Sequence, residues 1–214
     1  MVKRTNKNNR KRIQELVRHR RQSDILEAAA WVFKNQGFAT SSLDQVASRA
    51  GINKATIFYY FPNKEHLLYE VLCHALRMGA KKVSDSLNFC NTPLEKLQTI
   101  IRAHLRFNLS GFGGISVFEL KNLPPGLRKS YVELRDQYEQ MIAGILQEAV
   151  SASEIRQGDP KLWTRFILGL LNSVSYWFKK SGHLSIEDVG NEICNLFLYG
   201  TYSRTGDNIS NTTQ

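Results

Sequence analysis

The sequence has few cysteines and no long apolar run. Its three cysteines, Cys73, Cys90 and Cys194, lie far apart and form no Cys-x-x-Cys pair, which argues against a disulfide framework. No stretch reaches the roughly 18 continuous apolar residues of a membrane-spanning helix. The most apolar segment, residues 166–178, is interrupted by Asn172 and two serines. The basic N-terminus also lacks the apolar core of a secretion signal. We therefore expect a protein of the reducing cytoplasm.

Motifs for catalysis are missing as well. The sequence contains no Gly-x-Ser-x-Gly turn, no phosphate-binding loop and no glycine motif of the dinucleotide-binding folds. None of the histidines shows the spacing of a metal site; they are His19, His66, His74, His104 and His183. The sequence therefore indicates no enzyme, no cofactor and no metal site.

Acidic residues are scarce relative to basic ones. The 214 residues include 29 Lys and Arg but only 19 Asp and Glu, so the formal net charge is +10. Residues 1–22 hold nine of the basic residues and one acid, Glu15. Such a charge distribution favours a polyanionic partner. Residues 1–21, the basic arm, are polar and rich in asparagine, and we expect them to be disordered in the free protein.

Two interpretations of the basic arm stay open. It is either a solvated tail or an extension that follows the DNA minor groove and neighbouring phosphates. Beyond it, apolar residues recur at helical spacing from Ile25 almost to the end, and no alternating run is long enough for a strand. The sequence predicts an all-α fold of about nine helices, the first three short and the rest longer. Residues 204–214 are polar and are expected to form a disordered tail.

Residues 42–61 have the pattern of a helix, a glycine turn and a second helix. Ser42 and Gln45 form a capping-box pattern, and Gly51 permits the tight turn. Ile57 and Phe61 define the inward face of the second helix. In a helix-turn-helix this second helix lies in the major groove of DNA. Its predicted outward residues are Lys54, Ala55, Thr56, Tyr59 and Tyr60. The alternative for the two tyrosines is that they close the three-helix core; exposure is favoured for Tyr59, and the sequence leaves Tyr60 open.

These residues resemble the DNA-binding domain of TetR-family transcriptional regulators. The motifs are Ile25-Leu-Glu-Ala-Ala-Ala30, Phe33-x-x-x-Gly37-Phe38, Ser41-Ser-Leu-x-x-Val46-Ala47-x-x-Ala50-Gly51-Ile52 and Ala55-Thr-Ile-Phe-Tyr-Tyr-Phe61-Pro-Asn-Lys64-Glu-x-Leu67. The match covers about 45 residues without a gap. It implies a helix-turn-helix DNA-binding domain at residues 22–69 and a helical ligand-binding and dimerisation domain at 70–203. It also implies homodimers that bind palindromic operators and dimerise through their last two long helices.

The resemblance assigns roles to single positions of the helix-turn-helix. Lys54, Ala55 and Thr56 match the family's base-reading residues. Its phosphate contacts correspond to Ser41, Ser42, Tyr59, Tyr60 and Lys64. One position departs from the pattern, because Phe58 stands where the family usually has a tyrosine. Without the hydroxyl, we expect Phe58 only to pack.

The C-terminal half contains the segments Phe118-Glu-Leu-Lys-Asn-Leu-Pro-Pro-Gly-Leu-Arg128, Tyr131-Val-Glu-Leu-Arg-Asp-Gln-Tyr138, Asp159-Pro-Lys-Leu and Tyr176-Trp-Phe-Lys-Lys-Ser-Gly-His-Leu-Ser185. These segments resemble the subgroup of the family whose members respond to acyl-CoA thioesters. Arg102 and Arg106 lie four residues apart on one face of a predicted helix, and guanidinium groups suit the phosphates of such a ligand. The alternative interpretation is that each arginine is an ordinary surface residue. The aromatic residues would then be core residues or dimer contacts. The predicted ligand-binding residues are Arg102, Arg106, Phe107, Phe118, Arg128, Tyr131, Tyr138 and Phe166.

Together these patterns predict a cytoplasmic, homodimeric transcriptional repressor. A small hydrophobic effector, with an acyl-CoA thioester as the candidate, would release it from its operator. A ligand-independent, nucleoid-type DNA-binding protein is the alternative, and it would have a filled C-terminal core. An enzyme or carrier with a DNA-binding head is a further alternative, although no nucleophile and base stand at a recognisable spacing. The sequence does not distinguish a repressor from an activator.

Overall fold

The computed structural model describes residues 2–110, 113, 115 and 117–200, with the backbone alone for residues 2–10, 117 and 118. This part of the chain contains helices and no strand, which confirms the all-α class. It comprises α1 (Val2–Gln36), α2 (Leu43–Ala50), α3 (Lys54–Tyr60), α4 (Lys64–Leu87), α5 (Pro93–Asn108), a short 3-10 helix η1 (Val117–Asn122), α6 (Pro125–Ser151), α7 (Pro160–Trp177) and α8 (Ile186–Tyr199). None of these helices is both long and apolar enough to cross a membrane.

Capping residues fix where most helices begin. The side chains of Asn53, Asn63, Asp159 and Ser185 each accept a hydrogen bond from a backbone N–H in the first turn of the helix that follows. Ser42 and Gln45 form both bonds of the capping box that the sequence predicts for α2. Gly51 ends α2 with φ 64°, in the left-handed region that glycine enters without a steric penalty. The local sequence therefore dictates the helix-turn-helix geometry.

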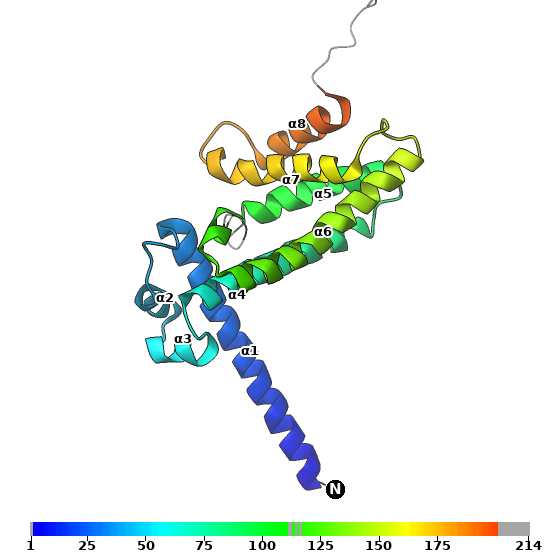
Figure 1. The fold of residues 1–214 in the computed structure, drawn as a ribbon. Coiled ribbons are helices and arrows are strands. Elements are labelled where there is room, and N and C mark those ends of the chain that lie inside the picture. Colours follow the sequence, from blue (N-terminus) through cyan, green and yellow to red (C-terminus); the bar gives the residue numbers. More distant parts are fainter. Residues whose placement is uncertain (1, 111–112, 114, 116, 201–214) are drawn as a thin grey trace, which may run out of the picture.

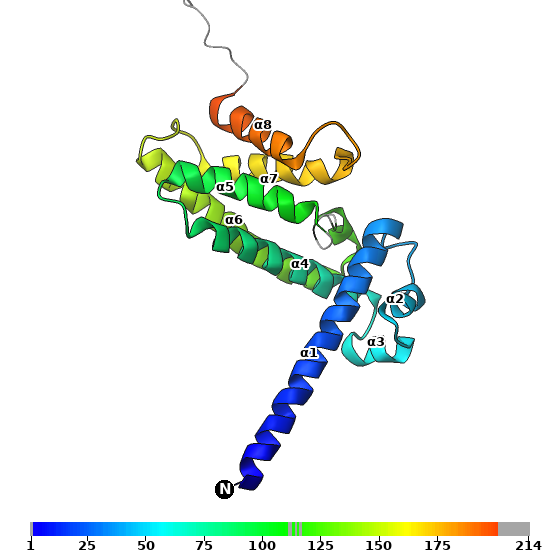
Figure 2. The same ribbon diagram turned by 180° about the vertical axis from the view of Figure 1, so that it is seen from behind.

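The helices form two apolar cores. The first is built from the end of α1, from α2 and α3, and from the first half of α4, with Ile25, Phe33 and Leu67 among its buried residues. The second lies among α4 to α8, where α5 packs against four other helices. Figures 1 and 2 show α4 and α6 running side by side from the first group of helices into the second.

The two cores are not independent. Leu123 lies just before α6, and Tyr131 lies in the second turn of this helix. Both are buried in the first core with residues of α1–α4. The helix α4 passes without a break across the boundary that we expected between residues 69 and 70. A displacement of α4 or α6 therefore acts on the N-terminal helices directly.

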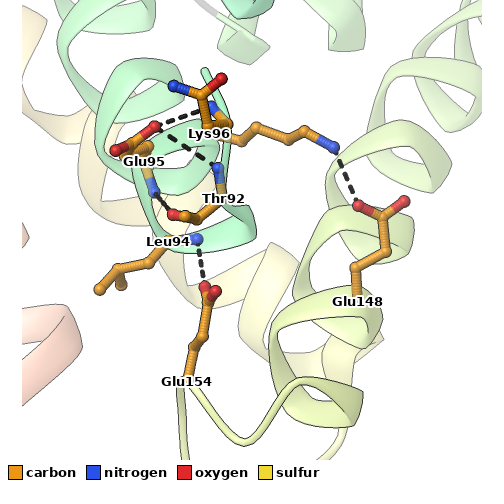
Figure 3. A network of polar contacts seen from close by, with 7 residues as sticks. Thr92, Leu94, Glu95, Lys96, Glu148 and Glu154 are labelled. Carbon is orange, nitrogen blue, oxygen red and sulfur yellow. Dashed lines mark hydrogen bonds and ion pairs between the residues drawn. The ribbon is translucent and has the colours of Figure 1, made fainter.

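Polar contacts hold the far end of the second group of helices (Figure 3). Glu154, just after α6, accepts a hydrogen bond of 2.7 Å from the backbone N–H of Leu94 at the start of α5. One turn away, the Nζ of Lys96 lies 3.0 Å from Oε2 of Glu148. These contacts join the beginning of α5 to the end of α6. The end of α5 and the beginning of α6 therefore face the N-terminal domain.

The basic arm differs from its expected state. We expected it to be disordered and the first helix to be short, but residues 2–21 form the first part of the 35-residue helix α1. Lysine, arginine and glutamine favour helix, and this stretch contains no proline or glycine that would end one. The side chains of residues 11–21 are all exposed. Figures 1 and 2 show this part of α1 projecting beyond α2 and α3, away from α5–α8.

Candidate nucleic-acid interface and effector cavity

The helix α3 presents one face to solvent and buries the other. Ile57 is fully buried and Phe61 nearly so, which confirms the predicted inward face. Lys54 and Ala55 are exposed, and 71% of the Tyr59 side chain is accessible. The expected outward residues Thr56 and Tyr60 are half-buried. Small residues at the start of the exposed face allow this helix to approach base edges closely.

Local contacts orient the polar residues of this face. The side chain of Asn53 accepts hydrogen bonds of 2.8 Å from both the backbone N–H and the hydroxyl of Thr56. The Nζ of Lys54 lies 2.8 Å from Oδ2 of Asp44 on α2, and both side chains are largely exposed. Exposed ion pairs contribute little to stability. Lys54 can therefore exchange Asp44 for a DNA group at little energetic cost.

Phe58 is only partly packed within the protein. Its side chain is 48% exposed, so the ring does not have the buried position expected of a residue that only packs. The ring lies on the outer surface because Ile57 and Phe61 already fill the inward face of a helix that is only seven residues long. An exposed aromatic ring here can make apolar contacts but no hydrogen bond.

Two of the predicted phosphate contacts are occupied inside the protein. Ser41 is buried, and its hydroxyl donates a hydrogen bond of 2.9 Å to the carbonyl of Phe38. Lys64 donates to the same carbonyl and, at 2.6 Å, to the carbonyl of Ser41. Its ammonium also lies 4.3 Å from the centroid of the Phe38 ring, and burial lowers its pKa. In this conformation Lys64 joins α4 to the α1–α2 connection, and neither residue is presented to a phosphate.

Ser42 and Tyr60 occupy intermediate positions. The hydroxyl of Ser42 accepts the backbone N–H of Gln45 at 3.2 Å and is half-buried at the start of α2. The Tyr60 ring packs edge-on against Tyr59, with 5.0 Å between the centroids. Tyr59 is therefore the more accessible member of the pair. A phosphate contact from Ser42 or Tyr60 stays a prediction.

A cavity of about 240 Å³ lies among α4, α5, α6 and α7. Leucines, alanines and Val83 of α4 form one wall of it. Three of the predicted ligand-binding residues, Phe107, Tyr131 and Tyr138, line the cavity. All three are largely buried, and burial raises the pKa of Tyr131 to about 12, so that its hydroxyl stays neutral. Three of the five predicted aromatic residues are therefore assembled around one space.

The other predicted ligand-binding residues lie elsewhere. An Nη2 of Arg102 donates to Oδ1 of Asn191 at 3.2 Å, and Nη2 of Arg106 lies 3.3 Å from Oε1 of Glu187. Both arginines therefore face α8, on the side of α5 away from the cavity. Arg128 is exposed and donates to the carbonyls of Lys121 and Leu123.

The last two predicted ligand-binding residues are both phenylalanines. Phe166 is 58% exposed and does not line this cavity. The side chain of Phe118 lies outside the described part of the chain.

Sequence reasoning missed the polar residues of the cavity. Asn108, His104 and Asn172 all line it. Asn172 Oδ1 lies 3.1 Å from Nδ2 of Asn108 and 3.3 Å from Nε2 of His104, while Nδ1 of His104 lies 3.0 Å from the Tyr138 hydroxyl. Burial lowers the pKa of His104 to about 4, although its hydrogen bond with Asn172 acts in the opposite direction. The signal was present, since His104 and Asn108 flank Phe107 at helical spacing and Asn172 interrupts the most apolar segment.

A lysine connects the N-terminal domain to the rim of the cavity. Nζ of Lys34, near the end of α1, donates hydrogen bonds of 3.2 Å to the carbonyl of Ser110 and 2.8 Å to that of Gly113. Gly113 lines the cavity. Burial, with a smaller contribution from Lys180, lowers the pKa of Lys34. Together with Tyr131, which belongs to the first core and to the cavity wall, this lysine couples the two halves.

The outer face of α7 and α8 exposes several large apolar side chains. The opposite faces of both helices are buried in the second core. The exposed large hydrophobic residues of the outer face are Leu162, Phe166, Tyr176, Trp177, Leu196 and Tyr199. Contiguous exposed apolar surface is a common feature of protein interaction sites.

Comparison with known proteins agrees with both halves of this geometry. The family model of the bacterial regulatory proteins of the tetR family matches residues 25–71, and that of the tetracyclin repressor-like C-terminal domain matches residues 90–201. The chain is 25% identical over 185 residues to the fatty acid metabolism regulator protein of Bacillus subtilis (strain 168), covering 84% of this chain and 95% of that protein. It is 28% identical over 191 residues to the HTH-type transcriptional repressor KstR2 of Mycolicibacterium smegmatis, covering 87% and 93% of the two chains.

Solved structures give the same result. The TetR-family regulator PfmR from Thermus thermophilus has a TM-score of 0.75 and 30% sequence identity, over 84% of this chain and 99% of that one. AibR, solved in complex with isovaleryl coenzyme A and operator DNA, has a TM-score of 0.76 at 22% identity, over 85% and 100% of the two chains. The matched families and relatives are transcriptional regulators and not enzymes. Since a family model matches each half and α2–α3 has the expected helix-turn-helix geometry, the chain belongs to the TetR family of bacterial transcriptional regulators.

Proposed function

We propose that this regulator is a homodimeric repressor that leaves a palindromic operator when an acyl-CoA thioester enters the cavity among α4–α7. The observation that carries the proposal is the position of this cavity. It is largely apolar, and two of its lining residues, Tyr131 and Gly113, also contact the N-terminal domain. A ligand in this space therefore acts on the helices that hold α3.

The DNA side of the proposal rests on the exposed face of α3. Lys54, Ala55 and Thr56 read base edges in the major groove, and the hydroxyl of Tyr59 donates to a phosphate. The ring of Phe58 contacts deoxyribose or a thymine methyl group. Ser42 and Tyr60 add phosphate contacts at the edges of this surface. The basic arm then contributes phosphate contacts outside the operator core, because its described side chains are exposed and its charge complements DNA.

The effector side rests on the size and composition of the cavity. A volume of about 240 Å³ is below the 300–1,000 Å³ typical of pockets for drug-sized ligands, so it suits an acyl group and leaves the coenzyme A nucleotide outside. Arg165 lines the cavity and is exposed, which makes its guanidinium available to phosphates at the entrance. Two similarities support the class: one relative is named for fatty acid metabolism, and the AibR structure holds isovaleryl coenzyme A.

The mechanism needs two states that the effector binds unequally. In the DNA-binding state, two α3 helices of a dimer enter successive major grooves about 34 Å apart. An acyl group in the cavity displaces α4 and α6 relative to each other and shifts the Lys34 contacts with Ser110 and Gly113. The α3 helices then take a spacing that no longer fits the operator. The exposed apolar face of α7 and α8 forms the dimer contact, which sets the distance between the two α3 helices.

A nucleoid-type protein without a ligand is the less favoured function. Such a protein would have a filled C-terminal core, whereas this chain has a cavity there that is linked to the DNA-binding domain. The relatives reported above are named as a fatty acid metabolism regulator and a transcriptional repressor.

A gel-shift assay tests the proposal. The full-length protein is incubated with DNA from upstream of its own gene at fixed salt, with and without a panel of acyl-CoAs, and free coenzyme A serves as control. We expect a specific complex that one or more thioesters dissolve and coenzyme A does not. A specific complex that no thioester affects would reject the effector class, and weak binding to all sequences would favour the nucleoid-type function.

A further inference from the structure

Four polar side chains form one cluster on the wall of the cavity. His104 and Asn108 come from α5, Tyr138 from α6 and Asn172 from α7, and we call them the polar quartet. Most of the remaining wall is apolar, with leucines and alanines from α4 and Leu168 from α7. A wall made only for an alkyl chain would not need such a cluster, because buried polar groups are unfavourable unless they are hydrogen-bonded.

The hydrogen bonds within the quartet fix where its protons lie. Oδ1 of Asn172 can only accept, so Nδ2 of Asn108 donates to it at 3.1 Å and Nε2 of His104 donates to it at 3.3 Å. With its proton on Nε2, the neutral imidazole accepts at Nδ1, and the Tyr138 hydroxyl donates there over 3.0 Å. Asn172 is therefore held from two helices, with its amide nitrogen directed away from these partners.

The quartet carries no charge at neutral pH. Burial lowers the pKa of His104 to about 4, and burial raises the pKa of Tyr138. The nearby Arg135, which also lines the cavity, is compensated by Glu139, with 2.9 Å between Nε and Oε1. The cluster is therefore suited to a neutral polar group and not to a carboxylate or a phosphate.

One strong donor of the quartet has no partner among the residues that the structure describes. No hydrogen bond within this part of the chain involves Nδ2 of Asn172, and this atom is not among the buried polar atoms without a partner. It is therefore accessible, and since Asn172 lines the cavity, its two N–H groups are available to a molecule bound there. An alkyl chain in the cavity would remove water from these N–H groups and replace it with nothing.

We propose that the part of the effector that enters the cavity carries a neutral oxygen, a keto or hydroxyl group, which accepts a hydrogen bond from Asn172. This inference rests on the proposed function, because it specifies the acyl group of the same effector. A site that hydrogen-bonds a ligand oxygen discriminates strongly against the analogue that lacks it. A hydroxyl group could also donate to Oδ1 of Asn108, which accepts no hydrogen bond from another described residue.

Isothermal titration calorimetry on the full-length protein tests this assignment. The probes are octanoyl-CoA and a series of octanoyl-CoAs that carry one keto group at successive chain positions. We expect at least one keto derivative to bind on the order of tenfold or more tightly than octanoyl-CoA, because the keto oxygen accepts a hydrogen bond from a donor that an alkyl chain would cover without a partner. The inference is overturned if octanoyl-CoA binds as tightly as every keto derivative. If no thioester binds, the proposed effector class fails together with this inference.

A substitution at Asn172 connects the preference to this residue. Asn172→Leu removes the donors at similar volume, so we expect it to keep the affinity for octanoyl-CoA and to lose the preference for the keto derivative. Ser173→Ala is the matched control, because this neighbour on α7 bonds only to the carbonyl of Leu170 among the described residues and does not line the cavity. A preference that survives in Asn172→Leu would assign the oxygen contact to another residue and refute the assignment. Comparison of operator affinity without effector shows that each variant is folded.

Discussion

Lowering the pH should destabilise this protein through protonation of the buried His104 in the unfolded chain. The pKa of His104 falls from an ordinary value of 6.5 to about 4 in the folded state, and burial is the main cause. Between these pH values His104 binds a proton in the unfolded chain but not in the folded chain. The stabilising contribution of His104 to the free energy of unfolding is therefore complete above about pH 6.5 and is lost as the pH falls toward 4. With these two pKa values, acidification from pH 7 to pH 5 should lower the free energy of unfolding by about 2 kcal/mol.

The variant His104→Gln isolates this contribution from the other titrating groups. Glutamine can still donate and accept hydrogen bonds but does not bind a proton in this range. Urea unfolding, followed by far-ultraviolet circular dichroism at pH 7 and pH 5 and at one protein concentration, gives the free energies. We expect the variant to lose about 2 kcal/mol less than the wild type on acidification. Equal losses in the two proteins would refute the reasoning that His104 is buried and neutral.

Three further predictions concern DNA binding and its control. Thr56→Ala should weaken binding to the operator by about 1 kcal/mol or more and binding to unrelated DNA much less, as competition gel shifts would show; equal losses would remove Thr56 from base reading. Deletion of residues 2–21 should lower the slope of log K against log salt by roughly 0.9 for each phosphate that the basic arm neutralises, and an unchanged slope would place the arm outside the interface. Lys34→Met breaks the hydrogen bonds to Ser110 and Gly113 and should reduce the effect of an acyl-CoA on operator affinity by up to about 1–3 kcal/mol, whereas the exposed control Lys179→Met should not.

The sequence was most informative where structure is determined locally. Capping residues such as Ser42 and Asp159 satisfy backbone N–H groups within their own first turn, so the helix starts could be predicted from neighbouring residues. The inward face of α3 followed from the spacing of Ile57 and Phe61. The basic arm was harder, because low hydrophobicity predicts disorder while the absence of proline and glycine allows α1 to continue. Composition alone does not decide between these tendencies.

The cavity residues depended on contacts between distant helices. Arg102 and Arg106 lie on one face of α5, as predicted, but periodicity does not reveal that this face packs against α8. His104 lies on another face of the same helix and meets Asn172 from α7, a residue 68 positions away. Lys64 illustrates the same limit at the DNA-binding domain, because its acceptors belong to the preceding α1–α2 connection.

The most direct test of the account is the thermodynamic coupling between operator and effector. Fluorescence anisotropy gives the operator affinity of the full-length protein with and without a saturating thioester from the panel, and calorimetry gives the thioester affinity with and without operator. We predict that the thioester weakens operator binding by roughly 5- to 150-fold and that the operator weakens thioester binding by the same factor. A thioester that binds the protein and leaves operator affinity unchanged would contradict the claim that this cavity controls DNA binding.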